Sequence, residues 1–175
     1  MQQVATAPVE AAARGGALGF EDLYRTCRDD VYAYVAGLLR DRDAAEDVTA
    51  LAFERAYRRR RRFDPRRGSG RAWIFGIARN AALDELRRRK RSAPLLGEPE
   101  DPGVADSGDD ADLALQRAAL RSALAALELR DRELIALRFF AGLSQAEIGA
   151  VLAISPSAAG TRLSRAVEKL RKGMQ

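Results

Sequence analysis

The chain has 175 residues and a formal net charge of +5, and 47% of its residues are apolar, which is enough to form packed cores. It contains no histidine and a single cysteine, Cys27, which excludes disulfide frameworks and the common Cys/His metal and nucleophile sites. We therefore expect no metal, no cofactor and no enzymatic activity. The single cysteine predicts a reducing, cytoplasmic compartment. No apolar run approaches the ~20 residues that a bilayer-spanning helix needs.

Charge divides the chain into four segments. Residues 1–19 are rich in Ala and Gly, carry one basic and one acidic residue, and are predicted to be a disordered tail. Residues 20–91 carry 19 basic and 12 acidic residues. Residues 92–112 carry seven acidic residues and no basic ones, and residues 113–175 carry ten basic and five acidic residues. The two basic blocks indicate either two polyanion-binding units held apart by an acidic spacer, or arginine-rich helices whose charges are merely solvated.

The first basic block has the periodicity of helices. Apolar residues recur at helical spacing over 20–38, and Cys27 lies within that stripe, so we expect a buried structural thiol. A second helix is predicted over 44–62, where it ends in five consecutive arginines that repel one another and need an anionic partner or solvent. The proline and two glycines of 63–70 mark a loop, and a third helix follows over 71–91.

The remaining chain is predicted to be a linker followed by further helices. Residues 92–112 hold three prolines and three glycines among their acidic residues and cannot bury enough apolar surface to fold. Leucines at helical spacing then predict helices over 113–127 and 130–140. No segment shows sustained strand alternation. The expected fold is all-α, with two small helical domains, 20–91 and 113–175, joined by a flexible acidic linker.

The most informative segment runs from 142 to 172. Residues 144–147 read Ser-Gln-Ala-Glu, a capping box, and Ser155-Pro156 is a second helix-start signal. Two capped helices this close together predict a helix-turn-helix, whose second helix enters the major groove. The alternative is a helical hairpin with a solvated polar face. The side chains predicted to meet DNA are hydroxyls and arginines suited to base edges and phosphates: Ser157, Thr161, Arg162, Ser164 and Arg165.

Several motifs, in order and at matching spacing, resemble the extracytoplasmic-function (ECF) type of bacterial RNA polymerase sigma factor. They are FEDLY (20–24), DAAEDV (43–48), AFERAYR (52–58), RFDP (62–65), RAWIFGIARN (71–80), DELRR (84–88), LRFFAGLSQAEI (137–148) and TRLSRA (161–166). The resemblance implies that the first domain is sigma region 2, which docks on the polymerase clamp helices and reads the minus-ten element. The second would be region 4, which reads the minus-35 element and touches the polymerase flap. The acidic linker would lie near the polymerase active site.

The resemblance also assigns roles to individual residues. Those expected at minus-ten DNA are Phe63, Arg66, Arg67, Ser69, Arg71, Asn80, Arg87 and Arg88. Those expected to dock on polymerase are Asp47, Ala50, Leu51, Phe53, Glu54 and Tyr57. A base pulled from the stack needs a pocket, and the separated strand needs positive charge along it. The amide of Asn80 would line that pocket; the alternative is that it is a helix cap or an ordinary solvent-exposed amide. Trp73 could stack on a base, but its place in the apolar stripe favours core packing.

Two positions depart from the family pattern. Ala50 and Leu51 stand where the family usually has a polar pair that meets the clamp helices, and Gly160 stands where it often has a basic residue beside the groove. We expect altered polymerase contacts at the first position and weaker minus-35 binding at the second.

The expected partners are core RNA polymerase, promoter DNA and an anti-sigma protein. One rival hypothesis is a helix-turn-helix regulator that is not a polymerase subunit. This hypothesis gives no function to the arginine-rich first domain. The other is a nucleic-acid enzyme, but Glu46 and Asp47 are adjacent on a helix, so their carboxylates diverge instead of clustering around a metal.

Overall fold

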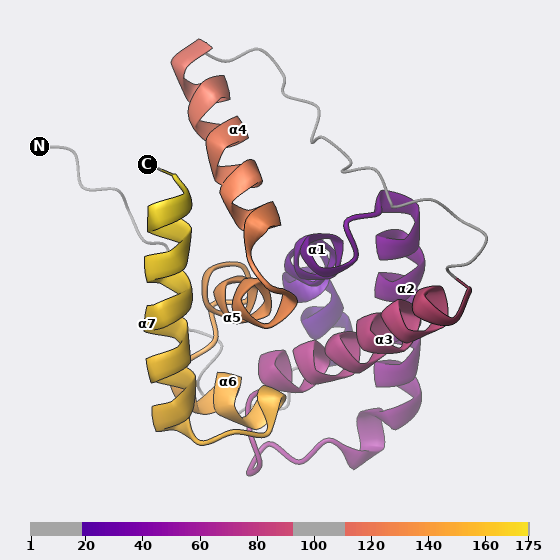
Figure 1. Ribbon diagram of the computed structural model, residues 1–175. Coiled ribbons are helices and arrows are strands. Elements are labelled where there is room, and N and C mark those ends of the chain that lie inside the picture. The colour runs from indigo at the N-terminus through magenta and orange to yellow at the C-terminus, as the bar shows by residue number, and fades with distance from the viewer. Residues whose placement is uncertain (1–18, 93–110, 175) are drawn as a thin grey trace, which may run out of the picture.

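The computed structural model describes residues 19–92 and 111–174, and this part of the chain is helical and contains no strand. The elements are α1 (Phe20–Leu39), α2 (Arg42–Arg59), the 3-10 turn η2 (Arg60–Arg62), α3 (Gly70–Ser92), α4 (Ala111–Ala126), α5 (Leu129–Phe139), α6 (Gln145–Leu152) and α7 (Pro156–Gly173). The predicted all-α fold is confirmed. The predicted tail lies outside the described residues except for Gly19, and the helices at either end of the predicted linker extend into it. In Figure 1, α1–α3 form one group of helices and α5–α7 a second group beside it.

The break between the first two helices is a capping site. Asp41 has an extended backbone, and its carboxylate accepts a hydrogen bond from the amide of Ala44 at 3.0 Å. An acidic N-cap satisfies a free amide of the first turn and suits the positive end of the helix dipole. Because of this cap α2 begins at Arg42, two residues earlier than the apolar pattern predicts.

The hydrophobic core is continuous between the two groups of helices. Val31 and Phe75 of the first group and Leu137 and Ile148 of the second are each 0% exposed and belong to one cluster. Cys27 is 2% exposed, so the predicted burial of its thiol is confirmed. The two domains are therefore not separate bodies in this structure but pack against each other through apolar side chains.

The first turns of α4 differ from the prediction. Leu113 and Leu120 were expected to face a core, yet they are 44% and 37% exposed, whereas Leu127 is 8% exposed. The reason is the length of α7, whose Gly173 already lies beside Ala123 at the C-terminal half of α4. No helix of the described residues lies beside the earlier turns, which project away from the second group in Figure 1.

An ion-pair network ties the end of α3 to the start of α2. Arg89 donates to Asp41 and to Glu85, both at 2.8 Å, and Arg88 donates to both oxygens of Glu85 at 2.7 Å. The hydrogen bond from Arg88 is the largest influence on Glu85 and, together with that from Arg89, it outweighs burial and lowers the pKa of Glu85 to about 2. The carboxylate is thus bound more favourably in the folded chain than in the unfolded one.

This network predicts an acid-sensitive contribution to stability. The folded pKa of Glu85 lies below its ordinary value of 4.5, so the contribution is fully present above pH 4.5 and is lost as pH falls toward about 2. We expect Glu85→Gln to flatten the pH dependence of the free energy of unfolding in this window, measured by urea titration. Glu54→Gln, which removes an exposed pair with Arg58, is the control and should leave it intact. Equal pH profiles for the two variants would contradict the network.

Candidate nucleic-acid interface

Both predicted starts of the helix-turn-helix are present as hydrogen-bonded caps. The Ser144 hydroxyl accepts from the amide of Glu147 at 3.3 Å, and the Glu147 carboxylate accepts from the amide of Ser144 at 2.9 Å, which completes the capping box of α6. The Ser155 hydroxyl accepts from the amide of Ala158 at 3.1 Å, with Pro156 in the first turn of α7. These caps fix where each helix begins, and hence the relative position of α6 and α7.

The face of α7 predicted to read DNA is exposed. Its five residues all lie in the N-terminal part of the helix on the solvent side: Ser157, Thr161, Arg162, Ser164 and Arg165. The opposite side anchors the helix through Ala159 and Ala166, which are 1% and 0% exposed. The Ser164 hydroxyl donates to the carbonyl of Gly160 at 3.1 Å, so it is left with acceptor lone pairs for a partner. The structure brings this predicted set together on one surface.

Gly149, whose role the sequence analysis did not predict, allows the backbone of the turn after α6 to pass close to that helix. A Cβ atom at this position would lie 2.7 Å from the carbonyl oxygen of Ile154 and 3.3 Å from the nitrogen of Pro156, both backbone atoms. The turn itself contains Ala153 in the left-handed conformation, with φ of 55°. A glycine near the end of α6 is therefore what lets the backbone of the turn pass directly over that helix.

Gly160 has a different environment. It is half-buried, and a Cβ atom there would lie 3.0 Å from the side-chain amide of Gln145 at the start of α6. Gln145 is exposed and flexible enough to move aside. Gly160 thus faces α6, in addition to its place at the edge of the groove-facing side.

Alanine at these two glycines is expected to have opposite effects. Gly160→Ala should raise the free energy of unfolding by up to about 1 kcal/mol, because alanine favours a helix interior and only a mobile side chain must shift. Gly149→Ala should lower it by about 1–3 kcal/mol, because backbone atoms must move. Urea denaturation followed by circular dichroism measures both. Two variants of equal stability would contradict the close packing of the turn on α6.

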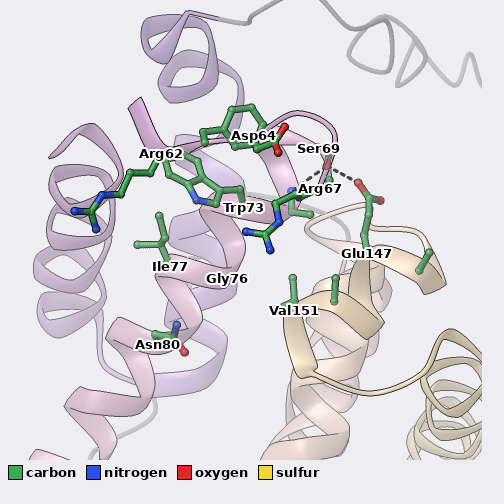
Figure 2. Close-up of a pocket in the computed structure, with 15 residues that line it drawn as sticks. Arg62, Asp64, Arg67, Ser69, Trp73, Gly76, Ile77, Asn80, Glu147 and Val151 are labelled. Carbon is green, nitrogen blue, oxygen red and sulfur yellow. Dashed lines mark hydrogen bonds between the residues drawn. The ribbon is translucent and has the colours of Figure 1, made fainter. Parts of the chain in front are cut away.

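The arginine-rich loop of the first domain leads into α3 and borders a cleft. The Ser69 hydroxyl accepts from the amide of Ala72 at 3.1 Å and so caps the first turn of α3. The ring of Phe63 packs on Trp73 with centroids 5.1 Å apart, so Trp73 is half-buried as the apolar stripe suggested. A cleft of about 610 Å³ lies between α3 and α6, and Figure 2 shows Trp73 and Asn80 on the wall opposite Glu147.

The predicted minus-ten residues are only partly gathered at this cleft. Phe63, Arg67, Ser69 and Asn80 line it, whereas Arg66, Arg71, Arg87 and Arg88 do not. The last two lie near the C-terminus of α3 and pair within that helix. Arg71 is half-buried between the domains, where its guanidinium pairs with Asp30 of α1 and also donates to the carbonyl oxygens of Phe140 and Ala141 in the second domain.

The predicted polymerase surface lies on α2. Of its six residues, five are exposed: Asp47, Ala50, Leu51, Glu54 and Tyr57. The sixth, Phe53, is 4% exposed, and its ring packs edge-on against Phe20 and Tyr24, so it supports this surface from beneath. Tyr24 of α1 is 43% exposed beside it and was not among the predicted residues.

A helix-turn-helix packed against a second helical domain with an arginine-rich loop defines a two-domain DNA-binding protein. Comparison with known proteins narrows this class. Residues 23–92 match the family description Sigma-70 region 2, and residues 117–170 match Sigma-70, region 4.

The chain is 37% identical over 156 residues to the RNA polymerase sigma factor CarQ of Myxococcus xanthus, covering 87% of each chain. It is 31% identical to the ECF RNA polymerase sigma factor SigL of Mycobacterium tuberculosis, covering 97% of this chain and 96% of SigL. The chain belongs to the ECF sigma factors of the sigma-70 family. The resemblance inferred from the sequence motifs is thereby confirmed.

Solved structures show the same arrangement of helices. The sigma factor RpoE of Bartonella quintana, solved with the anti-sigma factor NepR, matches with a TM-score of 0.74 and 22% identity over 89% of this chain and 96% of that one. CnrH, solved with the cytosolic domain of CnrY, matches with a TM-score of 0.62 and 28% identity over 93% and 91%. Within residues 19–92 and 111–174, no helix is long and apolar enough to cross a membrane.

Proposed function

We propose that this chain binds core RNA polymerase and directs it to a specific set of promoters, with the first domain reading the minus-ten element and the second the minus-35 element. The observation that carries the proposal is the exposed recognition helix α7, in a helix-turn-helix whose two helices each begin at a serine cap, in the same chain as a region 2 domain. A sigma factor needs both parts, whereas a conventional regulator needs only the helix-turn-helix.

The loop before α3 would handle the separated DNA strand. Arg66 and Arg67 are exposed and can follow phosphates, and the exposed amide of Asn80 can pair with the edge of a base. Asn80 shares the cleft with Trp73, which would form an apolar wall for a flipped base. No catalytic step is needed, because binding energy alone holds the base outside the stack, and we propose that the chain itself is not an enzyme.

The exposed side of α2 would dock on polymerase. Leu51 and Tyr57 are 36% and 50% exposed there, and the guanidinium of Arg60 lies 3.9 Å from the Tyr57 ring centroid. Aromatic and apolar side chains at a charged rim are typical of a protein-protein interface. Ala50 and Leu51 make the centre of this surface more apolar than the polar pair usual in the family.

An anti-sigma protein would control the chain in the cytoplasm. The support for this part is that RpoE was solved with the anti-sigma factor NepR, and that CnrH was also solved with a partner, the cytosolic domain of CnrY. A pull-down from cells should return such a protein beside core polymerase; recovery of polymerase alone would argue against this part of the proposal.

Reconstitution with core polymerase tests the main proposal. Purified chain plus core enzyme should produce run-off transcripts from a small set of genomic promoters that share two elements, and core enzyme alone should not. Sequencing of the transcripts would also give the promoter sequence. A chain that binds DNA but starts no transcripts with core enzyme would instead be a regulator that is not a polymerase subunit.

A further inference from the structure

Gln145 is a polar side chain of the helix-turn-helix to which the sequence motifs assign no contact. It is the first residue of α6, and the capping box between Ser144 and Glu147 fixes where that helix begins. Its side chain is exposed, and its amide makes no hydrogen bond to any other residue that the structure describes. The N–H donors of this amide are therefore available to a partner.

The position of the Gln145 side chain depends on Gly160 of α7. Helix α6 packs beside the first half of α7 (Figure 1). A Cβ atom at Gly160 would lie 3.0 Å from both Oε1 and Nε2 of Gln145 and 3.1 Å from its Cδ. The whole amide group thus lies over the backbone of Gly160, in space that a side chain longer than that of alanine would fill.

Gly160 borders the face of α7 that is predicted to read DNA. Its neighbours on the helix surface are Ser157, three residues before it, and Ser164, four residues after it, and both are exposed. The Ser164 hydroxyl also donates to the carbonyl of Gly160 at 3.1 Å. Because it lies over Gly160, the amide of Gln145 extends this face at the edge nearest α6.

A phosphate of the DNA backbone is the partner that fits this edge. In a helix-turn-helix the second helix enters the major groove, whereas the first helix crosses the backbone. Gln145 stands at the start of that first helix and beside the groove-facing side of the second. Side-chain amides commonly donate to phosphate oxygens, and such contacts fix the register of a protein on the duplex.

We propose that Gln145 binds a backbone phosphate of minus-35 DNA, and that Gly160 positions it by leaving room for its amide. This inference deepens the proposed function and rests on it. Where the family often has a basic residue at position 160, a neutral amide from α6 here occupies the same edge. A neutral donor supplies a hydrogen bond without the counterion release that a cation would cause. Gln145 therefore offsets part of the affinity lost at Gly160 and leaves binding less dependent on salt.

Binding of the holoenzyme to promoter duplexes, followed by fluorescence anisotropy, tests the contact. Gln145→Ala should weaken binding about three- to tenfold, by a similar factor for every single-pair substitution in the minus-35 element, because phosphates carry no base identity. Gln116→Ala removes an exposed glutamine of α4 and is the matched control, which should bind like wild type. An unchanged affinity for Gln145→Ala, or a loss confined to one base pair, would overturn the phosphate contact.

A charge at the same place gives a readout that a purely structural role would not change. Gln145→Lys places a cation opposite the proposed phosphate, so the plot of log affinity against log salt concentration should become steeper by about 0.9. Gln116→Lys adds the same charge to α4 and should leave the slope unchanged. Equal slopes for Gln145→Lys and wild type would contradict the proposal.

A double-variant cycle tests the positioning role of Gly160. Leucine at this position fills the space of the amide without adding charge, so Gly160→Leu should lose about as much affinity as Gln145→Ala. The double variant should then bind no more weakly than either single variant. Circular dichroism checks that each variant keeps its helices. Additive losses would show that the two residues act separately, whereas a wild-type holoenzyme that binds no promoter duplex would overturn the proposed function itself.

Discussion

Replacing Phe75 by alanine is expected to lower the free energy of unfolding by about 3–5 kcal/mol, the largest loss of stability that we predict for a single side chain. The Phe75 ring is 0% exposed and meets the Tyr34 ring edge-on with centroids 5.4 Å apart. The Arg71 guanidinium lies 5.5 Å from its centroid. Alanine would leave a cavity between α1 and α3 that the surrounding helices cannot fill, since these neighbours are themselves held by other contacts.

Urea titration followed by circular dichroism measures this loss. Leu115→Ala is the matched control, because Leu115 is 71% exposed on α4, so its removal should change stability by no more than about 0.5 kcal/mol. An unfolding midpoint for Phe75→Ala equal to that of the control would show that the ring is not the centre of the first domain's core.

Local signals in the sequence were sufficient for the positions of the helices and for the start of the helix-turn-helix. Ser144 and Ser155 predict where α6 and α7 begin, because a hydroxyl cap depends only on residues close by in the chain. Both caps are present in the structure. Cys27 could be placed in the core because it shares a helical stripe with apolar residues. Each of these predictions depends on contacts within four residues along the chain.

Predictions that depend on distant contacts were incomplete. Phe75 is buried because α3 packs against α1, α2 and the second domain, and spacing within α3 alone does not reveal these contacts. Phe53 matched a docking motif, yet rings from α1 cover it. The pair of Arg79 with Glu133 joins residues 54 apart in sequence, and helical spacing contains no signal for it.

The signal that could have found the contact between domains was chemical. Glu133 is a carboxylate directly before the buried Leu134 and Ile135, and a charged group in such a position needs a partner. Sequence alone gives no means of naming that partner. The same limit applies to Gly149, whose role follows from a backbone approach that only the folded turn creates.

Promoter recognition through α7 depends on the side chains that this helix exposes to solvent in its first turns. Arg165 is exposed on the same face as Thr161 and lies about 2.5 helical turns after Pro156, the first residue of α7. A recognition helix presents its first turns to the base edges, and a guanidinium can donate two hydrogen bonds to one guanine. Arg171 lies on the same helix, is also exposed, and sits in the last turn, away from the predicted groove.

Arg165→Ala is therefore expected to weaken binding of the holoenzyme to its minus-35 element by about 1–3 kcal/mol, roughly 5- to 150-fold, and to relax discrimination at one base pair. Arg171→Ala removes the same charge and should reduce affinity far less, with no change of base preference, because it loses only long-range attraction. Fluorescence anisotropy with promoter duplexes substituted one pair at a time distinguishes the two. If both arginine variants lost affinity equally and at every sequence, Arg165 would act on the phosphate backbone and the base readout by α7 would have to come from its hydroxyl side chains.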